Sequence, residues 1–157
     1  MALPEVCVVY LLRTSAEGLE VLLGDKRTGL GRGKVVGIGG KLDPGESARD
    51  AAVREVLEEV GVAVAASDLL DAGAIDYHFP TKPEWSQRST VFVARRWSGD
   101  PVETAEITPR WYPLSEVPYA QMWDDAVRWL PAVLRGGRVD ARYTFGPDLS
   151  TVVLEAS

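Results

Sequence analysis

The chain has 157 residues, of which 46% are hydrophobic and 25% charged, and this suffices for one globular domain with its own core. The net charge of −6 argues against a nucleic-acid polymer as partner, because binding to a phosphate backbone calls for a basic surface. The only cysteine, Cys7, has no partner for a disulfide, and the longest apolar run, 6–12, is far shorter than the roughly 20 residues of a membrane helix. We therefore expect a single domain over residues 1–157 that is cytoplasmic and has no membrane partner.

The N-terminal segments predict strands. Residues 6–13 and 19–27 are rich in Val, Leu and Tyr and flank a polar Ser-Ala-Glu-Gly stretch, which is typical of a β-hairpin. Residues 29–34 form a basic loop with three glycines, whose spacing matches neither common glycine-rich phosphate motif. A mobile surface loop is therefore favoured over a phosphate site. Residues 34–38 predict a short strand that leads into Gly40.

The stretch 40–62 predicts a turn and then a helix. A Pro-Gly pair turns the chain, and Ser47 with Asp50 three residues further on predicts a capping box. Apolar residues recur every four positions up to Val60, which is typical of a helix with one face in a core. We therefore expect a helix from Ser47 to about Val60, followed by Gly61.

Three glutamates of this helix share one face. Glu55, Glu58 and Glu59 lie at i, i+3 and i+4, and like charges at that spacing repel by roughly 0.2–0.5 kcal/mol per pair. A bound cation would account for the cluster, and hard carboxylate oxygens suit Mg²⁺ or Mn²⁺. A solvated acidic face is the alternative, and most helical charge runs are of that kind.

A longer pattern decides between the two. The spacing of glycines, glutamates and one arginine between positions 40 and 62 reproduces the signature of the Nudix hydrolases without a mismatch, and it consists of Gly40, Glu46, Arg54-Glu55, Val56, Glu58-Glu59 and Gly61-Val62. Chance agreement in a chain of this length is on the order of one in a million. The resemblance implies an α/β/α sandwich with a mixed sheet. It also implies Mg²⁺-dependent hydrolysis of a nucleoside diphosphate linked to a further group.

The chemistry of that family gives each residue a role. Breaking a pyrophosphate bond needs divalent ions that neutralise phosphate oxygens and acidify water, and a carboxylate that holds or deprotonates this water. The resemblance implies that Glu55 orients the water, that Glu58 and Glu59 hold metal, and that Arg54 orients Glu55. From spacing alone, Arg54 could equally pair with Asp50 or Glu58.

Two further positions of the motif leave alternatives open. Glu46 is either a metal ligand or a favourable charge near the N-terminus of the helix. Gly40 either lets its backbone approach metal or phosphate closely, or serves a turn that needs a positive φ.

The remainder of the chain completes an α/β pattern. Apolar and aromatic segments predict strands at 62–66, 72–79, 89–97, 111–114 (a last central strand) and, as closing edge strands, 138–145 and 151–154. Residues 122–134 predict a second helix, in which Pro131 indicates a kink or a late start. Strands interleaved with two helices make a layered α/β domain. The only histidine, His78, has no role in the expected mechanism.

Outside the motif the chain is similar to the MutT-type branch of the family, which includes a human enzyme that cleaves oxidised purine nucleoside triphosphates to monophosphate and pyrophosphate. The segments that carry this resemblance are 37–41, 99–103, 106–111, 122–125 and 129–131. The resemblance implies that Glu106 assists at the metal site, that Trp123 packs on the purine, and that the pocket is lined by Lys26, Lys41, Tyr77 and Asp125. Trp123 could instead be a core residue of a helix, Tyr77 ordinary sheet packing, and Lys26 a surface charge.

Two departures concern the base pocket. Val36 stands where the human-type pocket has an asparagine, and Ala126 stands where it has the second of two aspartates. The first aspartate is kept as Asp125, and Asp124 could replace the second by a register shift. A missing partner for a buried polar edge costs about 1–3 kcal/mol, which would weaken discrimination of an oxidised base. We expect hydrolysis of 8-oxo-dGTP or a related nucleotide. The alternatives are a dinucleoside polyphosphate or sugar nucleotide as substrate, or a non-catalytic nucleotide-binding domain.

Overall fold

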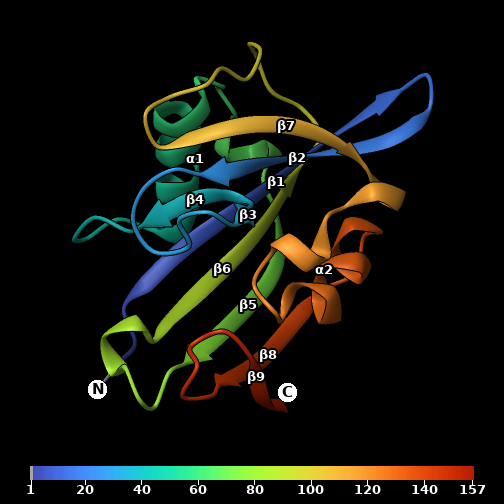
Figure 1. Cartoon of the computed structure of the whole chain (residues 1–157). Helices are drawn as coiled ribbons and strands as arrows, with labels where there is room; N and C mark the ends of the chain where they lie inside the picture. The colour runs from blue at the N-terminus through green and yellow to red at the C-terminus, as the bar shows by residue number, and fades with distance from the viewer. Residues whose placement is uncertain (1) are drawn as a thin grey trace.

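A computed structural model of the chain describes residues 2–157, in which one mixed sheet of nine strands lies between two α-helices (Figure 1). The strands are β1 (Glu5–Ser15), β2 (Gly18–Lys26), β3 (Val35–Val36), β4 (Ile38–Lys41), β5 (Leu70–His78), β6 (Gln87–Ala94), β7 (Ile107–Pro113), β8 (Val139–Phe145) and β9 (Val152–Ala156). The helices are α1 (Ala48–Val60) and α2 (Ala126–Leu134), with short 3₁₀ turns at Ala66–Asp68, Pro83–Trp85, Leu114–Glu116 and Tyr119–Gln121.

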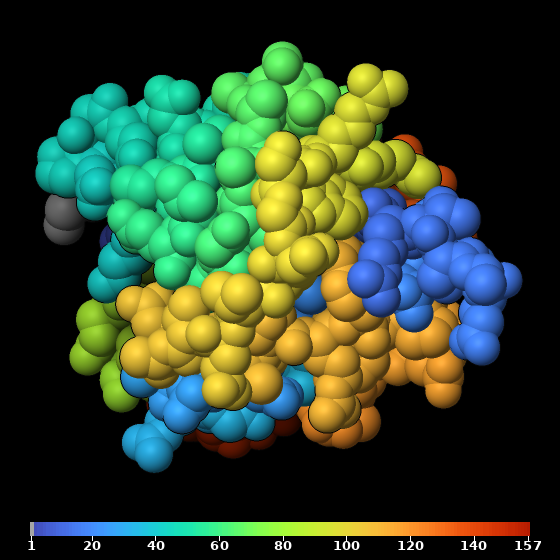
Figure 2. All heavy atoms as spheres, turned by 90° about the horizontal axis from the view of Figure 1, so that it is seen from above, coloured from blue at the N-terminus to red at the C-terminus, as the bar shows by residue number. Residues whose placement is uncertain are grey.

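The sheet is organised around β1. The main strand order is β3-β2-β1-β6-β5-β8-β9, and β4 and β7 pair with β1 and β2 respectively. The β1–β6 and β5–β8 pairs are parallel, whereas the other pairs are antiparallel. The antiparallel β1–β2 pair confirms the predicted hairpin, whose tip projects from the body of the molecule (Figures 1 and 2). Pairing with β4 sets Gly39 and Gly40 opposite Val8 and Cys7, so β1 fixes where the glycines of the motif lie.

Both faces of the sheet are buried, which gives the three layers of the expected sandwich. Along β1, Cys7, Val9 and Leu11 belong to the core on the α1 side, while Tyr10 and Leu12 belong to the core on the α2 side. Strands covered on both faces read as continuous apolar runs, as 6–12 does. Across residues 2–157, no helix is long and apolar enough to span a membrane.

The first helix begins and ends as the sequence predicts. The Ser47 hydroxyl accepts the backbone N–H of Asp50 at 3.0 Å, and Gly61 adopts φ +72° while its N–H donates to the carbonyl of Leu57 at 3.0 Å. A left-handed residue of this kind closes helices because glycine adopts it without steric cost. The turn chemistry therefore fixes the frame in which the glutamates project.

The second helix begins later than residue 122, although Pro131 still lies inside it. It begins at Ala126, because Tyr119–Gln121 forms a separate 3₁₀ turn and Met122 is extended with ψ 174°. The prediction that the helix begins at residue 122 is therefore wrong. Trp123 consequently lies in the loop before α2 rather than in a helix.

Four strand predictions need correction, each for a reason of tertiary pairing. Residues 62–66 form no strand but a single bridge between Ala63 and Ser98. The strand expected at 89–97 is β6, which ends at Ala94. The strand expected at 111–114 is β7, which begins at Ile107 and lies at an edge because it pairs with β2 alone. The strand expected at the edge over 138–145 is β8, which lies between β5 and β9.

Candidate active site

Arg54 is the centre of the hydrogen bonds around α1. Its guanidinium donates to both carboxylate oxygens of Glu46 at 2.8 and 2.9 Å, to Glu55 Oε1 at 2.8 Å and to Glu58 Oε2 at 3.1 Å. A fifth hydrogen bond, at 3.0 Å, goes to the carbonyl of Lys41 on β4. The bond to Arg54 is the main cause that lowers the pKa of Glu46 to about 2. Arg54 thus fixes the orientation of Glu55 and joins it to the loop before α1.

Glu55 lies directly against Gly40. A Cβ added to Gly40 would lie 2.6 Å from the Glu55 carboxylate, so a larger residue at position 40 would displace this side chain. The φ of Gly40 is not positive, so the close approach, rather than the turn, accounts for glycine here. Burial raises the pKa of Glu55, and the hydrogen bond and charge of Arg54 oppose the rise.

Glu59 is the most deeply buried of the three glutamates. Its exposed fraction is 2%, and its Oε2 atom has no hydrogen-bond partner from residues 2–157. The Nζ atom of Lys26 lies 3.9 Å from the other oxygen. Burial raises the pKa of Glu59 to about 7, Lys26 opposes the rise, and the charges of Glu55 and Glu106 add to it.

The loop after β6 brings Glu106 to this cluster. Residues 95–106, yellow in Figure 2, pack beside α1, where Val102 N–H donates to the Val60 carbonyl at 2.9 Å. The Thr104 hydroxyl donates to the Glu59 carbonyl at 2.8 Å. A glutamate far away in the sequence is therefore held at the same site by contacts to the end of α1.

The donor set fits a divalent cation in its chemistry. Glu59 presents an orphaned, buried carboxylate oxygen, and Glu55 adds a second carboxylate beside the backbone of Gly40. Oxygen ligands of this kind are those that Mg²⁺ and Mn²⁺ prefer. Within residues 2–157, no three His, Cys, Asp or Glu side chains converge as a ready-made metal site. Three of the carboxylates, those of Glu46, Glu55 and Glu58, bond instead to the Arg54 guanidinium.

One cavity of about 670 Å³ runs from the glutamates to the loop before α2. It brings together most of the predicted site residues, namely Gly40, Glu55, Glu59, Glu106, Lys26, Lys41, Tyr77, Trp123 and Asp125. Glu46, Arg54 and Glu58 do not line it, and the Glu58 side chain is 59% exposed. The first part of the basic glycine loop, Gly29-Leu30, also contributes to the wall.

The deep end of the cavity is organised by Asp125. This residue is 1% exposed, and its Oδ2 atom accepts the Tyr77 hydroxyl at 2.8 Å and the Trp129 indole N–H at 2.7 Å. Burial raises the pKa of Asp125, although both hydrogen bonds oppose the rise. The two departures from the human-type pocket, Val36 and Ala126, line the same cavity. The register shift is not realised, because the Asp124 carboxylate accepts the Val152 N–H at 2.8 Å.

Aromatic side chains surround Trp123 at the mouth of the cavity. Lys34 Nζ lies 4.9 Å from its ring centroid, and the rings of Phe79 and Trp85 approach it edge-on at 6.1 and 6.4 Å. Sequence reasoning missed several lining residues, among them Tyr10, Phe79, Trp85, Gln87 and Ser89. Alternation along β6 could have placed Gln87 and Ser89 on one face, whereas nothing in the sequence places Trp85 near Trp123.

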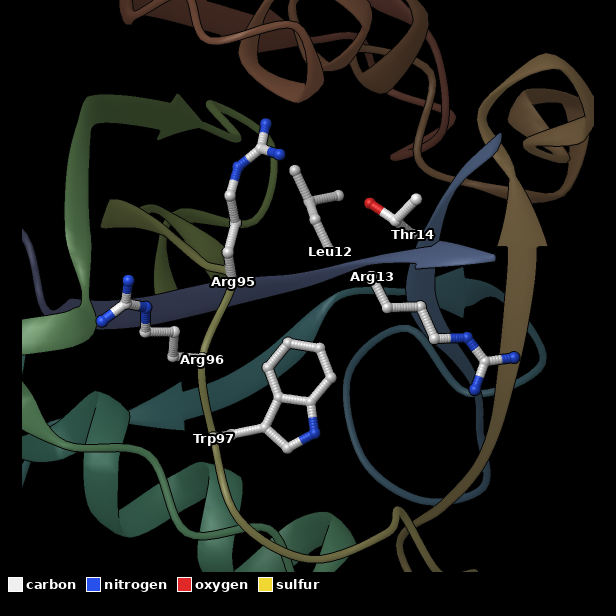
Figure 3. Close-up of a pocket in the computed structure, with 6 residues that line it drawn as sticks. All are labelled: Leu12, Arg13, Thr14, Arg95, Arg96 and Trp97. Atoms are coloured by element: carbon white, nitrogen blue, oxygen red, sulfur yellow. The ribbon is translucent and has the colours of Figure 1, made fainter. Parts of the chain in front are cut away.

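A second hollow of about 440 Å³ shares no residue with this cavity. It is lined by Leu12, Arg13, Thr14, Arg95, Arg96 and Trp97, and Figure 3 shows that its guanidinium groups point in different directions. Arg13 is also paired with Glu20 at 2.8 Å. Divergent charges of this kind do not form a joint site for one anion.

Comparison with known proteins places this geometry in a family. The model of the NUDIX domain matches residues 1–133. The chain belongs to the Nudix family. Nudix hydrolases generally use divalent metal ions and act on small nucleotides, so the oxygen-rich cluster and the adjoining cavity have the expected chemistry.

Two relatives confirm the MutT-type resemblance. The chain is 35% identical over 137 residues to the oxidized purine nucleoside triphosphate hydrolase of Mus musculus, covering 87% of this chain and 86% of that protein. It is 38% identical over 125 residues to the protein of the same name from Danio rerio, and the match covers 80% of this chain and 78% of that protein. The chain is thus a Nudix hydrolase of the MutT type.

Solved structures confirm the Nudix fold. The MutT protein of Bacillus halodurans superposes with a TM-score of 0.80 at 23% identity, covering 98% of this chain and 97% of that one. The Nudix domain of NrtR from Shewanella oneidensis, solved with ADP ribose, superposes with a TM-score of 0.70 at 18% identity. The match covers 87% of this chain and 88% of that one. At these identities the likeness concerns the fold alone.

Proposed function

We propose that this Nudix hydrolase cleaves a nucleoside triphosphate to the monophosphate and pyrophosphate, and that oxidised purine nucleotides such as 8-oxo-dGTP are its favoured substrates. The observation that carries the proposal is the single cavity that connects Glu55 and Glu59 with Trp123 and Asp125. A triphosphate at the glutamates and a base at Trp123 fit its two ends. The names of both curated relatives support this substrate class.

The metal is Mg²⁺, for which Mn²⁺ can substitute. Glu55, Glu58 and Glu59, with Glu46 and the Gly40 backbone, would hold it, and when bound it would neutralise phosphate oxygens and acidify the attacking water. Glu58 bonds to Arg54 through one oxygen only, which leaves the other available. Glu59 contributes the orphaned Oε2 atom.

Glu55 holds the attacking water and accepts its proton. Arg54, hydrogen-bonded to Glu55 at 2.8 Å, is a positioning residue that limits the rotation of this carboxylate. Glu106 assists from the opposite loop. A raised pKa suits a base, because a carboxylate with higher proton affinity accepts the proton of water more readily.

The remaining residues hold the nucleotide. Lys26 and Lys41 line the glutamate end and supply positive charge for phosphate oxygens. The indole of Trp123 packs on the base, and Asp125, oriented by Tyr77, accepts a hydrogen bond from it. We assign the chain to a single domain that acts in the cytoplasm on free nucleotides, without a nucleic-acid polymer or a membrane as partner.

The test is turnover of a nucleotide panel by Glu55→Gln and Glu58→Gln. Each variant keeps the shape of the side chain and removes the charge, so we expect a loss of at least about 100-fold in kcat, in line with losing a general base or a metal ligand. Hydrolysis in ¹⁸O-labelled water with Mg²⁺, followed by mass analysis, identifies the bond that is cleaved. Glu17→Gln, in the exposed hairpin turn, is the matched control. Unchanged turnover in both site variants would refute the proposal.

A further inference from the structure

Polar side chains other than that of Asp125 also line the cavity. Asp125, Ser89 and Tyr10 have exposed fractions of 1%, 5% and 3%, and all three line the cavity. Within residues 2–157, Asp125 Oδ1 is buried without a hydrogen-bond partner, whereas the hydroxyls of Ser89 and Tyr10 are not among the buried unpaired atoms and can bond to whatever fills the cavity. An unpaired buried carboxylate oxygen destabilises a fold, so the position of Asp125 Oδ1 on the cavity wall indicates a polar ligand.

The register of the sheet brings Gln87 to the same place. Gln87 on β6 is the cross-strand partner of Tyr77 on β5, and directly opposed residues of an antiparallel pair project from the same face. The Tyr77 hydroxyl bonds to Asp125, so Gln87 lies beside the residue that orients this carboxylate. Ser89 lies two positions further along β6 and shares the face. Half-buried Gln87 also lines the cavity and has no hydrogen bond from its side chain within the described part of the chain.

Several other residues that line the cavity are apolar. Val36 and Ala126 are apolar and line the cavity, and Trp123 supplies an aromatic face at its mouth. The polar groups available to a base therefore include Asp125, the side chains of Gln87 and Ser89 on β6 and the Tyr10 hydroxyl on β1. A carboxamide and a hydroxyl both donate and accept, whereas an ionised carboxylate only accepts.

We propose that Gln87 and Ser89 hydrogen-bond to the heteroatoms at the edge of the base and set which purine nucleotides are hydrolysed fastest. The inference rests on the proposed function and specifies its substrate class as purines with a ring carbonyl beside a ring N–H. The carbonyl accepts from Gln87 or Ser89, and the N–H donates to Asp125 Oδ1. An unsubstituted purine presents neither the carbonyl nor the N–H.

The test measures kcat/KM of two variants on two substrates. Gln87→Leu and Ser89→Ala are compared on deoxyinosine triphosphate, which has the carbonyl and the N–H, and on the deoxyriboside triphosphate of unsubstituted purine. We expect each variant to lower kcat/KM for deoxyinosine triphosphate about tenfold or more, and for the unsubstituted purine less than about threefold. The exposed Gln121→Leu makes the same chemical change outside the cavity and should alter neither. A uniform loss on both substrates, or no loss, would overturn the inference.

A binding measurement separates this inference from the proposed function. Tryptophan fluorescence in EDTA reports the affinity for the corresponding monophosphates without turnover. Gln87→Leu should weaken the binding of deoxyinosine monophosphate and leave that of the unsubstituted purine nucleotide within about threefold. If the wild-type chain hydrolyses no nucleotide, the proposed function fails, and this titration still decides whether Gln87 and Ser89 read the base. Equal affinities of wild type and variant for both nucleotides would overturn the inference.

Discussion

Glu59 is a buried acidic residue of the site with few partners: its Oε2 atom accepts no hydrogen bond from residues 2–157. Its pKa is raised from 4.5 to about 7, chiefly by burial, and only Lys26, 3.9 Å away, opposes this with a charge. A carboxyl with a higher pKa in the folded than in the unfolded chain binds protons more tightly when folded. Its contribution to folding therefore becomes more unfavourable as the pH rises from about 4.5 to 7, and stays so above pH 7.

Glu59→Gln should accordingly stabilise the metal-free protein, and more so at high pH. The two pKa values convert to a gain of up to about 3 kcal/mol at pH 8, with little gain near pH 4.5. Urea unfolding in EDTA at both pH values measures the difference, with Glu17→Gln as the exposed control. An equal gain at both pH values would show that the charge of Glu59 is not the cause.

At the scale of elements, β4 contains two adjacent glycines, Gly39 and Gly40, and a side chain at each position would collide with a different part of the structure. A Cβ on Gly39 would collide with the backbone carbonyl of Cys7 on β1, which cannot move without loss of the β1–β4 pairing. The three atoms nearest to a Cβ on Gly40 all belong to the end of the Glu55 side chain, which can turn away. Gly39 is therefore required for the pairing of β4 with β1, whereas Gly40 leaves room for the Glu55 carboxylate.

The variants Gly39→Ala and Gly40→Ala should separate stability from activity. We expect Gly39→Ala to lower the free energy of unfolding by at least about 2 kcal/mol, as steric overpacking does. Gly40→Ala should unfold within about 1 kcal/mol of wild type but lose at least about tenfold in kcat, because it displaces Glu55. Thermal unfolding and steady-state kinetics on both variants test this. The expectation is wrong if Gly40→Ala keeps full turnover, or if it is the less stable of the two.

The elements that the sequence predicts well are those fixed by local chemistry. Ser47 and Gly61 bound α1 through contacts within a few residues, and the β1–β2 hairpin is predicted from its two apolar segments and the polar turn between them. The position of β7 at an edge and of β8 inside the sheet depends on pairing between distant segments, which periodicity does not report. In the segment 62–66, only Val62 and Val64 are buried in the core on the α1 side, and a single bridge between Ala63 and Ser98 replaces the expected strand.

The site, too, has residues that local spacing predicts and residues that only the tertiary structure brings together. Spacing along one helix predicts that Glu55, Glu58 and Glu59 belong together, but it does not show that Arg54 bonds to Glu46, Glu55 and Glu58 at once. Gln87 and Ser89 are read as site residues only when the register of β6 against β5 is known. Local rules therefore give the catalytic helix, while the base end of the cavity depends on tertiary structure.

At the scale of the whole molecule, the cavity joins parts of the chain that belong to different layers. The glutamates come from α1 on one side of the sheet, and Trp123 and Asp125 come from the loop before α2 on the other. A nucleotide bound along this cavity would have its phosphates and its base held by different layers (Figure 1). Changes at one end should therefore alter the affinity for the base without altering the chemistry at the other.

Trp123→Ala tests this separation. Stacking of a base on an aromatic side chain contributes about 1–3 kcal/mol, so KM for a purine nucleotide should rise about 5- to 150-fold while kcat changes much less. Trp97→Ala is the control, because Trp97 stacks on Trp111 with ring centroids 5.7 Å apart and lines the other hollow. It should lower the melting temperature and leave KM unchanged. If kcat falls as steeply as KM rises in Trp123→Ala, the two ends of the cavity are coupled, and base binding helps to align the phosphates for attack.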